Sequence, residues 1–358
     1  MADTHDSKSC LERGEGSSPS SGTMQKIVCI LGQTATGKSD LAVEIAKKYN
    51  GEIISADSRQ TYKWLDIGSG KIKKGEMKGV KHYLLDVADP RYKRYTAADF
   101  AAAAKSAAND IFSRGKLPII CGGTGFYIES FLHENNFPPV LPNKKLRAKL
   151  SKLSAEALMK ELRRLDSVRA KNIDPKNKVR IIRAIEIAKS LGHVPPQRFN
   201  LCKYKILSIG LTLPSDKLKE KIHARLMKRM RGDALIKEIK NLHKRGVSWQ
   251  RLYDFGLEYR YVSIYLKSRA RSNLPDSRFD LARKEMLNEL EKEIYRFAKR
   301  QMTWFHRDKN IKWFFPSEKS KIEKEVKKFL TSPALPTGQA GGEAGNKKDI
   351  PGGTSLKK

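Results

Sequence analysis

The chain has 358 residues, enough for one large domain or two modest ones with a real hydrophobic core. Its 72 Lys and Arg against 39 Asp and Glu give a formal charge of +33, more than solubility requires. We therefore expect a polyanionic partner, with nucleic acid as the first candidate and an anionic membrane surface as the second.

Segments that would direct the chain into or across a membrane are not expected. No apolar run approaches the roughly 20 residues that span a bilayer, and the N-terminus lacks an apolar signal core. The four cysteines, Cys10, Cys29, Cys121 and Cys202, form no C-x-x-C pair, which argues against a structural zinc site and a disulfide framework. We expect a cytoplasmic, reducing setting.

The first half of the chain has the rhythm of an α/β protein. Residues 1–24 are rich in Ser, Gly and charge, so we expect a disordered extension. Residues 25–137 then alternate between short apolar strands and helices, which predicts a parallel sheet with helices on both faces. The expected strands are 27–31, 52–56, 83–87 and 117–121, and the expected helices are 40–49 and 96–113, the second capped by Thr96.

A phosphate-binding loop follows the first strand. The segment from Gly32 to Ser39 reads G-Q-T-A-T-G-K-S, a complete G-x-x-x-x-G-K-[ST] motif between a strand and a helix. Its amides and the helix N-terminus point at an anion, Lys38 adds a positive charge, and the Ser39 hydroxyl can hold Mg²⁺. We predict that the loop binds the phosphates of a ligand, but the motif alone does not say whether these belong to a nucleotide. The predicted binding residues are Gly32, Gln33, Thr34, Ala35, Thr36, Gly37, Lys38 and Ser39.

Two further motifs follow strands of the same sheet, where ligands of such folds bind. Asp57 could bind magnesium, cap a helix or act as a general base, and its place beside a phosphate loop favours the catalytic carboxylate. Gln60 offers both a donor and an acceptor, which suits the edge of an adenine. The glycine turn at 122–125 is either an ordinary turn or a close backbone approach to a ligand, with Thr124 as its polar group.

The second half is more helical and more basic. After a proline-rich linker, residues 138–202 are interpreted as an inserted helical subdomain, broken at Asp174-Pro175. Residues 203–330 return to the core with a strand at 206–211, a helical stretch at 217–245 that breaks near Gly232, and a long basic helix at 281–305. Residues 331–358 are expected to be a disordered tail.

Several cations in this half are candidates for phosphate contacts. Arg180 and Arg183 lie three residues apart on one helical face, which suits either nucleic-acid phosphates or a solvated charged surface. Arg225 follows the strand at 206–211 and could reach back to a bound phosphate. Lys299 and Arg300 are interleaved with aromatic residues and are candidates for contacts with nucleic-acid phosphates.

In this order the motifs resemble the bacterial tRNA dimethylallyltransferase family, also called the tRNA isopentenyltransferases. The resemblance runs from about Met24 to about Phe315. Glu258 departs from it, because the family usually has glycine there in an I-G-Y-[KR] turn, and this puts the local turn geometry in doubt. The matching segments are G-Q-T-A-T-G-K-S at 32–39, D-S-R-Q at 57–60, D-I-G-S-G-K at 66–71, A-D-P at 88–90, T-A-A-D-F at 96–100, C-G-G-T-G-F-Y at 121–127, V-R-I-I-R-A-I-E at 179–186 and A-K-R-Q-M-T-W-F at 298–305.

The resemblance implies a P-loop nucleoside-triphosphate-hydrolase-like fold and a reaction. A dimethylallyl group moves from dimethylallyl diphosphate to N6 of the adenosine on the 3′ side of the anticodon, in tRNAs that read codons beginning with U. Asp57, Lys38 and Arg225 would be catalytic, the phosphate loop would hold the diphosphate with Mg²⁺ on Ser39, and the adenosine would flip out of its stack. The implied tRNA contacts are Asp57, Ser58, Arg59, Gln60, Thr124, Arg147, Val179, Arg180, Ile181, Ile182, Arg183, Lys299 and Arg300.

The expected partners are dimethylallyl diphosphate and the anticodon stem-loop of tRNA, bound by a monomer that does not enter a membrane. Three alternatives are a P-loop nucleotide kinase, an adenylate isopentenyltransferase that uses free AMP or ATP, and a non-catalytic RNA-binding protein with a nucleotide switch. A kinase leaves the +33 charge and the basic last helix unexplained. The large helical insertion argues against a free nucleotide as acceptor.

Overall fold

The computed structural model describes residues 24–92, 94–132, 137–196, 204–271 and 276–333. The extension predicted at 1–24 therefore lies outside the described residues except for Met24, and so does the predicted tail beyond Pro333. Thr331, where that tail was predicted to begin, is the last residue of helix α14.

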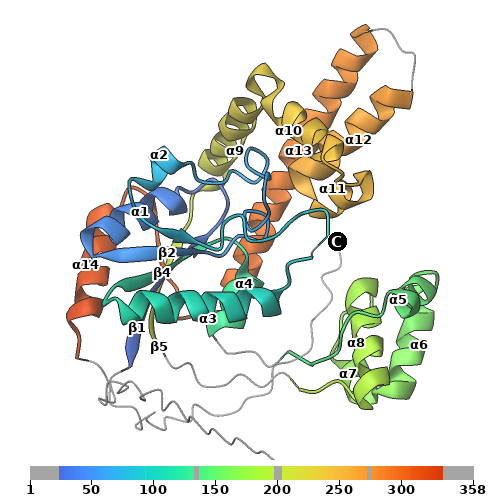
Figure 1. Cartoon of the computed structure of the whole chain (residues 1–358), viewed down its shortest axis with the longest axis horizontal. Helices are drawn as coiled ribbons and strands as arrows, with labels where there is room; N and C mark the ends of the chain where they lie inside the picture. Colours follow the sequence, from blue (N-terminus) through green and yellow to red (C-terminus); the bar gives the residue numbers. More distant parts are fainter. Residues whose placement is uncertain (1–23, 93, 133–136, 197–203, 272–275, 334–358) are drawn as a thin grey trace, which may run out of the picture.

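A fully parallel six-stranded sheet forms the centre of the core (Figure 1). The predicted α/β class is confirmed. The strand in the middle that carries the phosphate loop, β1, pairs with β4 on one side and β5 on the other, so the loop emerges near the centre of the sheet edge. The strands in spatial order are β3 (His82–Tyr83), β2 (Gly51–Ser55), β4 (Leu117–Gly122), β1 (Gln25–Gly32), β5 (Tyr204–Leu211) and β6 (Lys312–Phe314).

Helices cover both faces of the sheet because successive strand side chains point to opposite sides. Cys29 and Leu31 pack against α3 and α4, whereas Val28 and Ile30 pack against α1 and α14. The helices in chain order are α1 (Lys38–Lys48), α2 (Lys74–Met77), α3 (Ala97–Ser113), α4 (Gly125–Leu132), α5 (Lys144–Ser151), α6 (Ala155–Leu165), α7 (Ser167–Lys171), α8 (Lys178–Leu191), α9 (Ser215–Met230), α10 (Ala234–Lys244), α11 (Trp249–Phe255), α12 (Leu257–Arg271), α13 (Asp276–Phe305) and α14 (Lys319–Thr331).

The third strand is shorter than predicted. β3 contains two residues, because Leu84 and Asp86 have φ angles of 63° and 56°, in the left-handed region that interrupts an extended strand. The chain instead forms an isolated bridge between Tyr62 and Ala88. The prediction of a strand over 83–87 is therefore wrong beyond Tyr83, and the strand β6 has no counterpart in the predicted elements.

The helices α5–α8 have a small core of their own, in which Leu158, Leu162, Ile181 and Ile185 are fully buried. In Figure 1 they stand apart from the sheet. The gap between α7 and α8 contains the Asp174-Pro175 break, where the proline disfavours helix in the residue before it.

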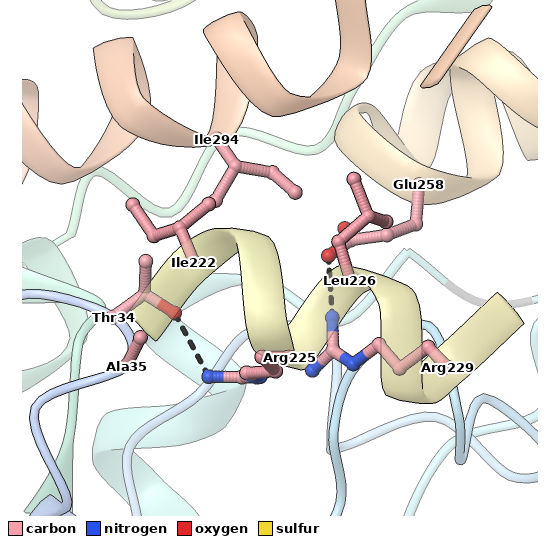
Figure 2. Close-up of a pocket in the computed structure, with 8 residues that line it drawn as sticks. All are labelled: Thr34, Ala35, Ile222, Arg225, Leu226, Arg229, Glu258 and Ile294. Carbon is pink, nitrogen blue, oxygen red and sulfur yellow. Dashed lines mark hydrogen bonds and ion pairs between the residues drawn. The ribbon is translucent and has the colours of Figure 1, made fainter. Parts of the chain in front are cut away.

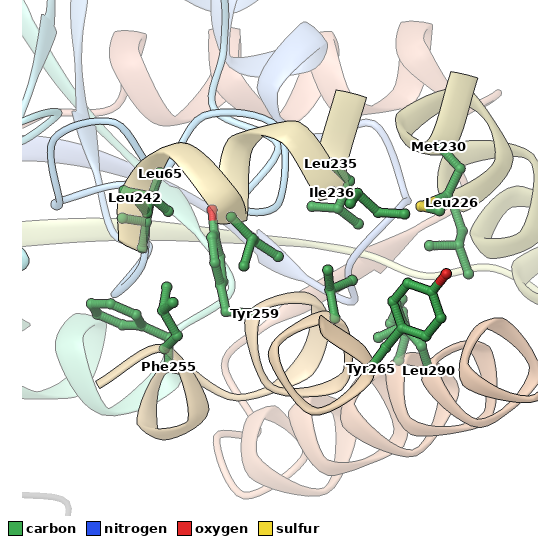
Figure 3. Packing of buried hydrophobic residues seen from close by; sticks show 14 of the residues in the cluster. Leu65, Leu226, Met230, Leu235, Ile236, Leu242, Phe255, Tyr259, Tyr265 and Leu290 are labelled. Carbon is green, nitrogen blue, oxygen red and sulfur yellow. The ribbon is translucent and has the colours of Figure 1, made fainter. Parts of the chain in front are cut away.

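Helices α9–α13 form a second helical region around a separate hydrophobic cluster (Figure 3). Tyr259 of α12 and Leu290 of α13 are fully buried there, together with Leu65 from the loop after β2. This packing fixes the loop after β2 against helices α12 and α13, whose residues Tyr259 and Leu290 lie 194 and 225 positions after Leu65. No helix in the described ranges is both long and apolar enough to cross a bilayer.

Glu52 of β2 is the buried anion of a charge network near the start of its strand. Its side chain is 4% exposed and accepts hydrogen bonds from Arg114 at 2.6 and 2.7 Å, from Lys116 at 2.7 Å and from the Tyr83 hydroxyl at 2.9 Å. The hydrogen bonds from Arg114 are the largest influence, and the pKa of Glu52 is lowered to about 2 despite its burial. We interpret this network as structural because it lies at the opposite end of β2 from the ligand edge.

We expect Glu52→Gln to lower the free energy of unfolding at neutral pH by about 2 kcal/mol, because Lys116 loses its carboxylate partner and Arg114 keeps only Asp110. The folded-state pKa lies below the ordinary value of 4.5, so Glu52 stabilises the fold above that pH, and the contribution is lost as the pH falls from 4.5 towards about 2. Urea unfolding of both proteins at neutral pH and in this acidic window measures the effect. An equal stability gap at the two pH values would contradict it.

Candidate active site

The phosphate loop has the backbone that its glycines require. Gly32 has a φ of 131°, and a Cβ atom placed on it would lie 2.2 Å from the Leu211 carbonyl oxygen of the neighbouring strand. Gly37, with a φ of 85°, stands immediately before the first turn of α1. The exposed Ser39 and the mostly buried Lys38 follow at the start of the helix. The predicted cradle therefore lies at the carboxyl end of β1, facing the crevice.

Lys38 is held back against its own loop, where its Nζ donates to the Gln33 carbonyl. Burial lowers the pKa of Lys38 to about 8; the nearby Cys121 and Asp57 oppose this shift, and the positive charge of Arg225 adds to it. Cys121, Asp57 and Arg225 are therefore the ionisable neighbours of Lys38.

Arg225 of α9 contacts the phosphate loop, where its Nη1 donates to the Thr34 hydroxyl at 3.1 Å (Figure 2). Burial is the main reason that the pKa of Arg225 is lowered to about 10, and the positive charge of Arg229 contributes. Among the described residues no carboxylate lies within ion-pair distance of Arg225 or Lys38. Lys38 and Arg225 are thus two mostly buried cations without an ion-pair partner among the described residues, an arrangement that favours a bound anion.

Arg229 lies one helical turn after Arg225, and its charge is compensated. Its Nη1 is 2.5 Å from Oε1 of Glu258, and both side chains are less than a tenth exposed.

Glu258 belongs to the first turn of α12, and the preceding turn is made by Gly256 and Leu257, which both have positive φ. Glu258 itself is helical and adds an inward carboxylate. A cavity of about 10 Å³, room for one water, is lined by Thr34, Ala35, Ile222, Arg225, Leu226, Arg229, Glu258 and Ile294 (Figure 2).

Asp57 stands at the end of β2 in a fixed orientation. Its Oδ1 accepts the amide N–H groups of Arg59 at 2.9 Å and Gln60 at 3.3 Å, and Oδ2 accepts no hydrogen bond from the described residues. The amide of Ser58 donates to the Thr124 hydroxyl at 3.0 Å, which joins this turn to the glycine turn after β4. One carboxylate oxygen is thus left to accept a proton from a ligand.

Gln60 and Arg59 diverge from the same turn. The Gln60 side chain accepts from the Ser55 hydroxyl and donates to the Gly70 carbonyl, each at 3.3 Å, which leaves one amide hydrogen for a ligand. Arg59 donates to the Phe255 carbonyl at 2.9 Å and lies over the Phe297 ring at 5.5 Å. Gln60 is therefore placed to contact a base, whereas Arg59 is used to join the turn to α11 and α13.

Gln301 of α13 belongs to the site and is absent from the predicted residues. Its side chain is 6% exposed, accepts the Thr34 amide N–H at 2.8 Å and donates to the Gly123 carbonyl at 2.9 Å. It ties the phosphate loop to the second glycine turn and removes the Thr34 amide from the set that can bind an anion. Its spacing from Ala298 and Phe305 would have placed it on the buried face of the helix.

The residues predicted from the insertion lie in a different part of the molecule from this crevice. Ile181 is fully buried in the insertion core, so the prediction that it contacts tRNA is wrong for its side chain. Arg147 and Arg183 bind the buried Glu186 at 2.6 and 2.5 Å. Burial raises the pKa of Glu186, but these arginines outweigh it and lower the pKa to about 2.

Five other predicted residues differ in their exposure to solvent. Val179 and Arg180 of the insertion are exposed, and Ile182 packs partly against the insertion core. Lys299 and Arg300 are exposed on α13, two positions and one position before the inward Gln301.

Comparison with known proteins decides the family. The family model described as IPP transferase matches residues 60–308. The chain belongs to the IPP transferase family. This membership confirms the resemblance, and the matched segment includes the insertion, Arg225, Glu258 and Gln301.

The IPP transferase relatives match along most of the chain. A tRNA dimethylallyltransferase of Anoxybacillus flavithermus is 36% identical, with 86% of this chain and 95% of the relative covered. A protein named tRNA dimethylallyltransferase 2 of Treponema denticola is 41% identical over 80% of this chain and 94% of its own length. The crystal structure of a tRNA isopentenylpyrophosphate transferase from Bacillus halodurans, 33% identical, superposes with a TM-score of 0.62 and covers 86% of this chain and 97% of that one. These relatives do not favour the kinase or the free-nucleotide alternative.

We expect Gln301→Ala to lower the free energy of unfolding by about 1–3 kcal/mol, because it leaves the Thr34 amide and the Gly123 carbonyl without a partner. The same change should weaken binding of inorganic pyrophosphate, measured by calorimetry. Gln250→Ala removes an exposed glutamine of α11 and is the matched control. Unchanged stability and pyrophosphate affinity in Gln301→Ala would show that the bridge has no role.

The pKa of Lys38 gives a second expectation. A phosphate ligand prefers the charged lysine, so pyrophosphate affinity should fall as the pH rises through about 8, by up to about tenfold per pH unit. In Lys38→Arg the charge persists over this range, so the decline should be absent. Titrations of the two proteins in identical buffers separate this effect from titration of the ligand; parallel curves would contradict it.

Proposed function

We propose that this member of the IPP transferase family is a tRNA dimethylallyltransferase. It transfers a dimethylallyl group from dimethylallyl diphosphate to N6 of the adenosine on the 3′ side of the anticodon, in tRNAs that read codons beginning with U. The observation that carries the proposal is that Lys38 and Arg225, which have no carboxylate at ion-pair distance among the described residues, lie near the oriented carboxylate of Asp57. We also propose that the enzyme acts as a cytoplasmic monomer.

The donor's diphosphate would bind to the loop amides after Thr34, to Lys38 and to Arg225. The charge of Arg225 lowers the pKa of Lys38, so the two cations lie near each other, and among the described residues neither has a carboxylate at ion-pair distance. As the bond between the allylic carbon and the diphosphate oxygen breaks, negative charge grows on the leaving group. Fixed cations in a mostly buried site stabilise that charge more strongly than water does.

The acceptor would enter from the Asp57 side. Its N6 forms a bond to the allylic carbon as the diphosphate leaves, and the surplus proton on N6 passes to Oδ2 of Asp57. The hydrogen bonds from the Arg59 and Gln60 amides to Oδ1 hold the carboxylate in place for this transfer. Gln60, with one amide hydrogen still available, is suited to hold the flipped base.

Mg²⁺ fits the donor side. Among the described residues no group of three His, Cys, Asp or Glu side chains could hold a metal ion, which argues against a site built from the protein alone. Mg²⁺ is commonly bound through one or two protein oxygens together with substrate phosphates and water. The exposed Ser39 hydroxyl at the start of α1 supplies such an oxygen. When bound, the ion would neutralise part of the charge of the diphosphate.

The remaining basic surface would hold the tRNA. Arg180 on the insertion and Lys299 and Arg300 on α13 are exposed cations in two separate regions, as contacts with an extended anticodon stem-loop require. Val179 is exposed beside Arg180. Arg147 and Arg183 would act mainly by holding Glu186 and thereby the shape of the insertion.

Asp57→Asn should slow prenyl transfer by roughly 10²–10⁴-fold, because the amide keeps the size of the side chain but cannot take the proton. The measurement is a single-turnover assay with dimethylallyl diphosphate and unmodified tRNA, with the modified nucleoside detected by mass spectrometry. The affinity for tRNA, measured by filter binding, should change little.

Asp216→Asn, which alters a carboxylate that is 90% exposed on α9, is the matched control and should keep the full rate. An Asp57→Asn enzyme as fast as the wild type would remove Asp57 from the mechanism. Failure of the wild-type protein to form any prenylated adenosine would overturn the proposed function.

A further inference from the structure

Two aromatic rings and two arginines form a connected series of contacts near the acceptor side of the crevice. The Arg245 guanidinium lies 4.9 Å from the centre of the Trp64 ring, and the Arg91 guanidinium lies 5.4 Å from the same ring. Arg91 also lies 4.8 Å from the centre of the Tyr92 ring. We call Arg245, Trp64, Arg91 and Tyr92 the Trp64 stack. Such contacts between guanidinium groups and aromatic faces are favourable at the protein surface.

The middle of the stack is held in place. Asp89 accepts hydrogen bonds from Arg91 Nε at 3.0 Å and Nη2 at 2.7 Å, which fixes the plane of the guanidinium. Trp64 has a φ of 66°, in the left-handed region that is unfavourable for so bulky a residue. The fold therefore maintains a strained tryptophan, and local strain of this kind is concentrated at functional sites.

The stack has an open end. Tyr92 is 80% exposed, more than any other aromatic side chain among the described residues. Arg91 and Arg94 are exposed nearby and pair with Asp89 and Asp254, each at 2.7 Å, and the exposed Arg245 adds a further cation. The Tyr92 ring thus has the Arg91 guanidinium near it and is otherwise largely open to solvent. Such a ring suits an unpaired nucleobase, because the base can stack on it while nearby positive charge attracts the phosphates.

The Trp64 stack lies close to Gln60, the residue proposed to hold the flipped base. The segments after Gln60 and before Arg91 run together, since the Asp86 amide donates to the Gln60 carbonyl at 3.2 Å and the Lys63 amide donates to the Ala88 carbonyl at 3.0 Å. Trp64 follows Gln60 by four residues, so their Cα atoms are at most about 14 Å apart. An RNA that delivers an adenosine to Gln60 brings its neighbouring nucleotides to the same region.

We propose that the Trp64 stack binds an unpaired base of the substrate RNA close to the adenosine that is modified, with Tyr92 as the stacking face. This rests on the proposed function, because it takes the acceptor to be part of an RNA. The stack would add affinity for a single-stranded loop and would take no part in the chemical step.

The test compares Tyr92→Ala, Tyr92→Leu and Tyr92→Phe with the wild type, using unmodified tRNA. Loss of one stacked base weakens binding by about 5- to 100-fold, so Tyr92→Ala should raise the Kd and the KM for tRNA by that factor with an unchanged kcat. Tyr92→Leu keeps apolar bulk without a ring and should behave like the alanine variant, whereas Tyr92→Phe should match the wild type. The dependence of Kd on salt should keep its slope in all four proteins, because no charge changes.

Thermal unfolding followed by circular dichroism should be the same for all four proteins, since Tyr92 is exposed. Wild-type affinity in Tyr92→Ala, wild-type affinity in Tyr92→Leu, or a changed salt slope would each overturn the stacking role. The proposed function fails by a different result, namely no prenylated adenosine from the wild-type enzyme. A binding defect of Tyr92→Ala in that case would still support the stack as an RNA contact.

Discussion

The structure depends on positive charge placed where little water can reach it. Lys38 and Arg225 come from helices on either side of the phosphate loop, and burial lowers the pKa of both. Among the described residues neither has a carboxylate at ion-pair distance, although Glu258 compensates the next arginine, Arg229. Desolvating a cation without a partner is unfavourable for folding, so the fold bears a cost that a bound anion would offset.

The groups around these cations are joined into one rigid unit. Gln301 links the phosphate loop to the glycine turn after β4, and Thr124 of that turn links to the turn that carries Asp57. Thr34 in turn contacts Arg225. The donor side and the acceptor side are therefore held at fixed positions through four short hydrogen-bonded connections, which is the condition for in-line transfer between two bound substrates.

Buried carboxylates and exposed cations have different roles in this protein. Inside, Glu52 and Glu186 each bind two cations and stabilise the sheet and the insertion. Outside, cations such as Arg180, Lys299 and Arg300 are left exposed, and they contribute to the large excess of positive charge. The insertion and α13 therefore present cations on two separate parts of the molecule, as an extended polyanion would require.

The sequence by itself determined the fold class, the family and the position of the phosphate loop and Asp57, because strand ends and glycine turns leave local patterns in the chain. It also predicted the insertion's helices and the break at Asp174-Pro175. Tertiary structure alone decided which cations are paired. Arg147 and Arg183 bind Glu186, while Arg225 has no carboxylate at ion-pair distance in the part of the chain that the structure describes. It also brought Gln301 to the loop and stacked Trp64 on Arg91. Such pairings join residues far apart in the chain, and a linear pattern contains no information on which distant side chain will fill a given space.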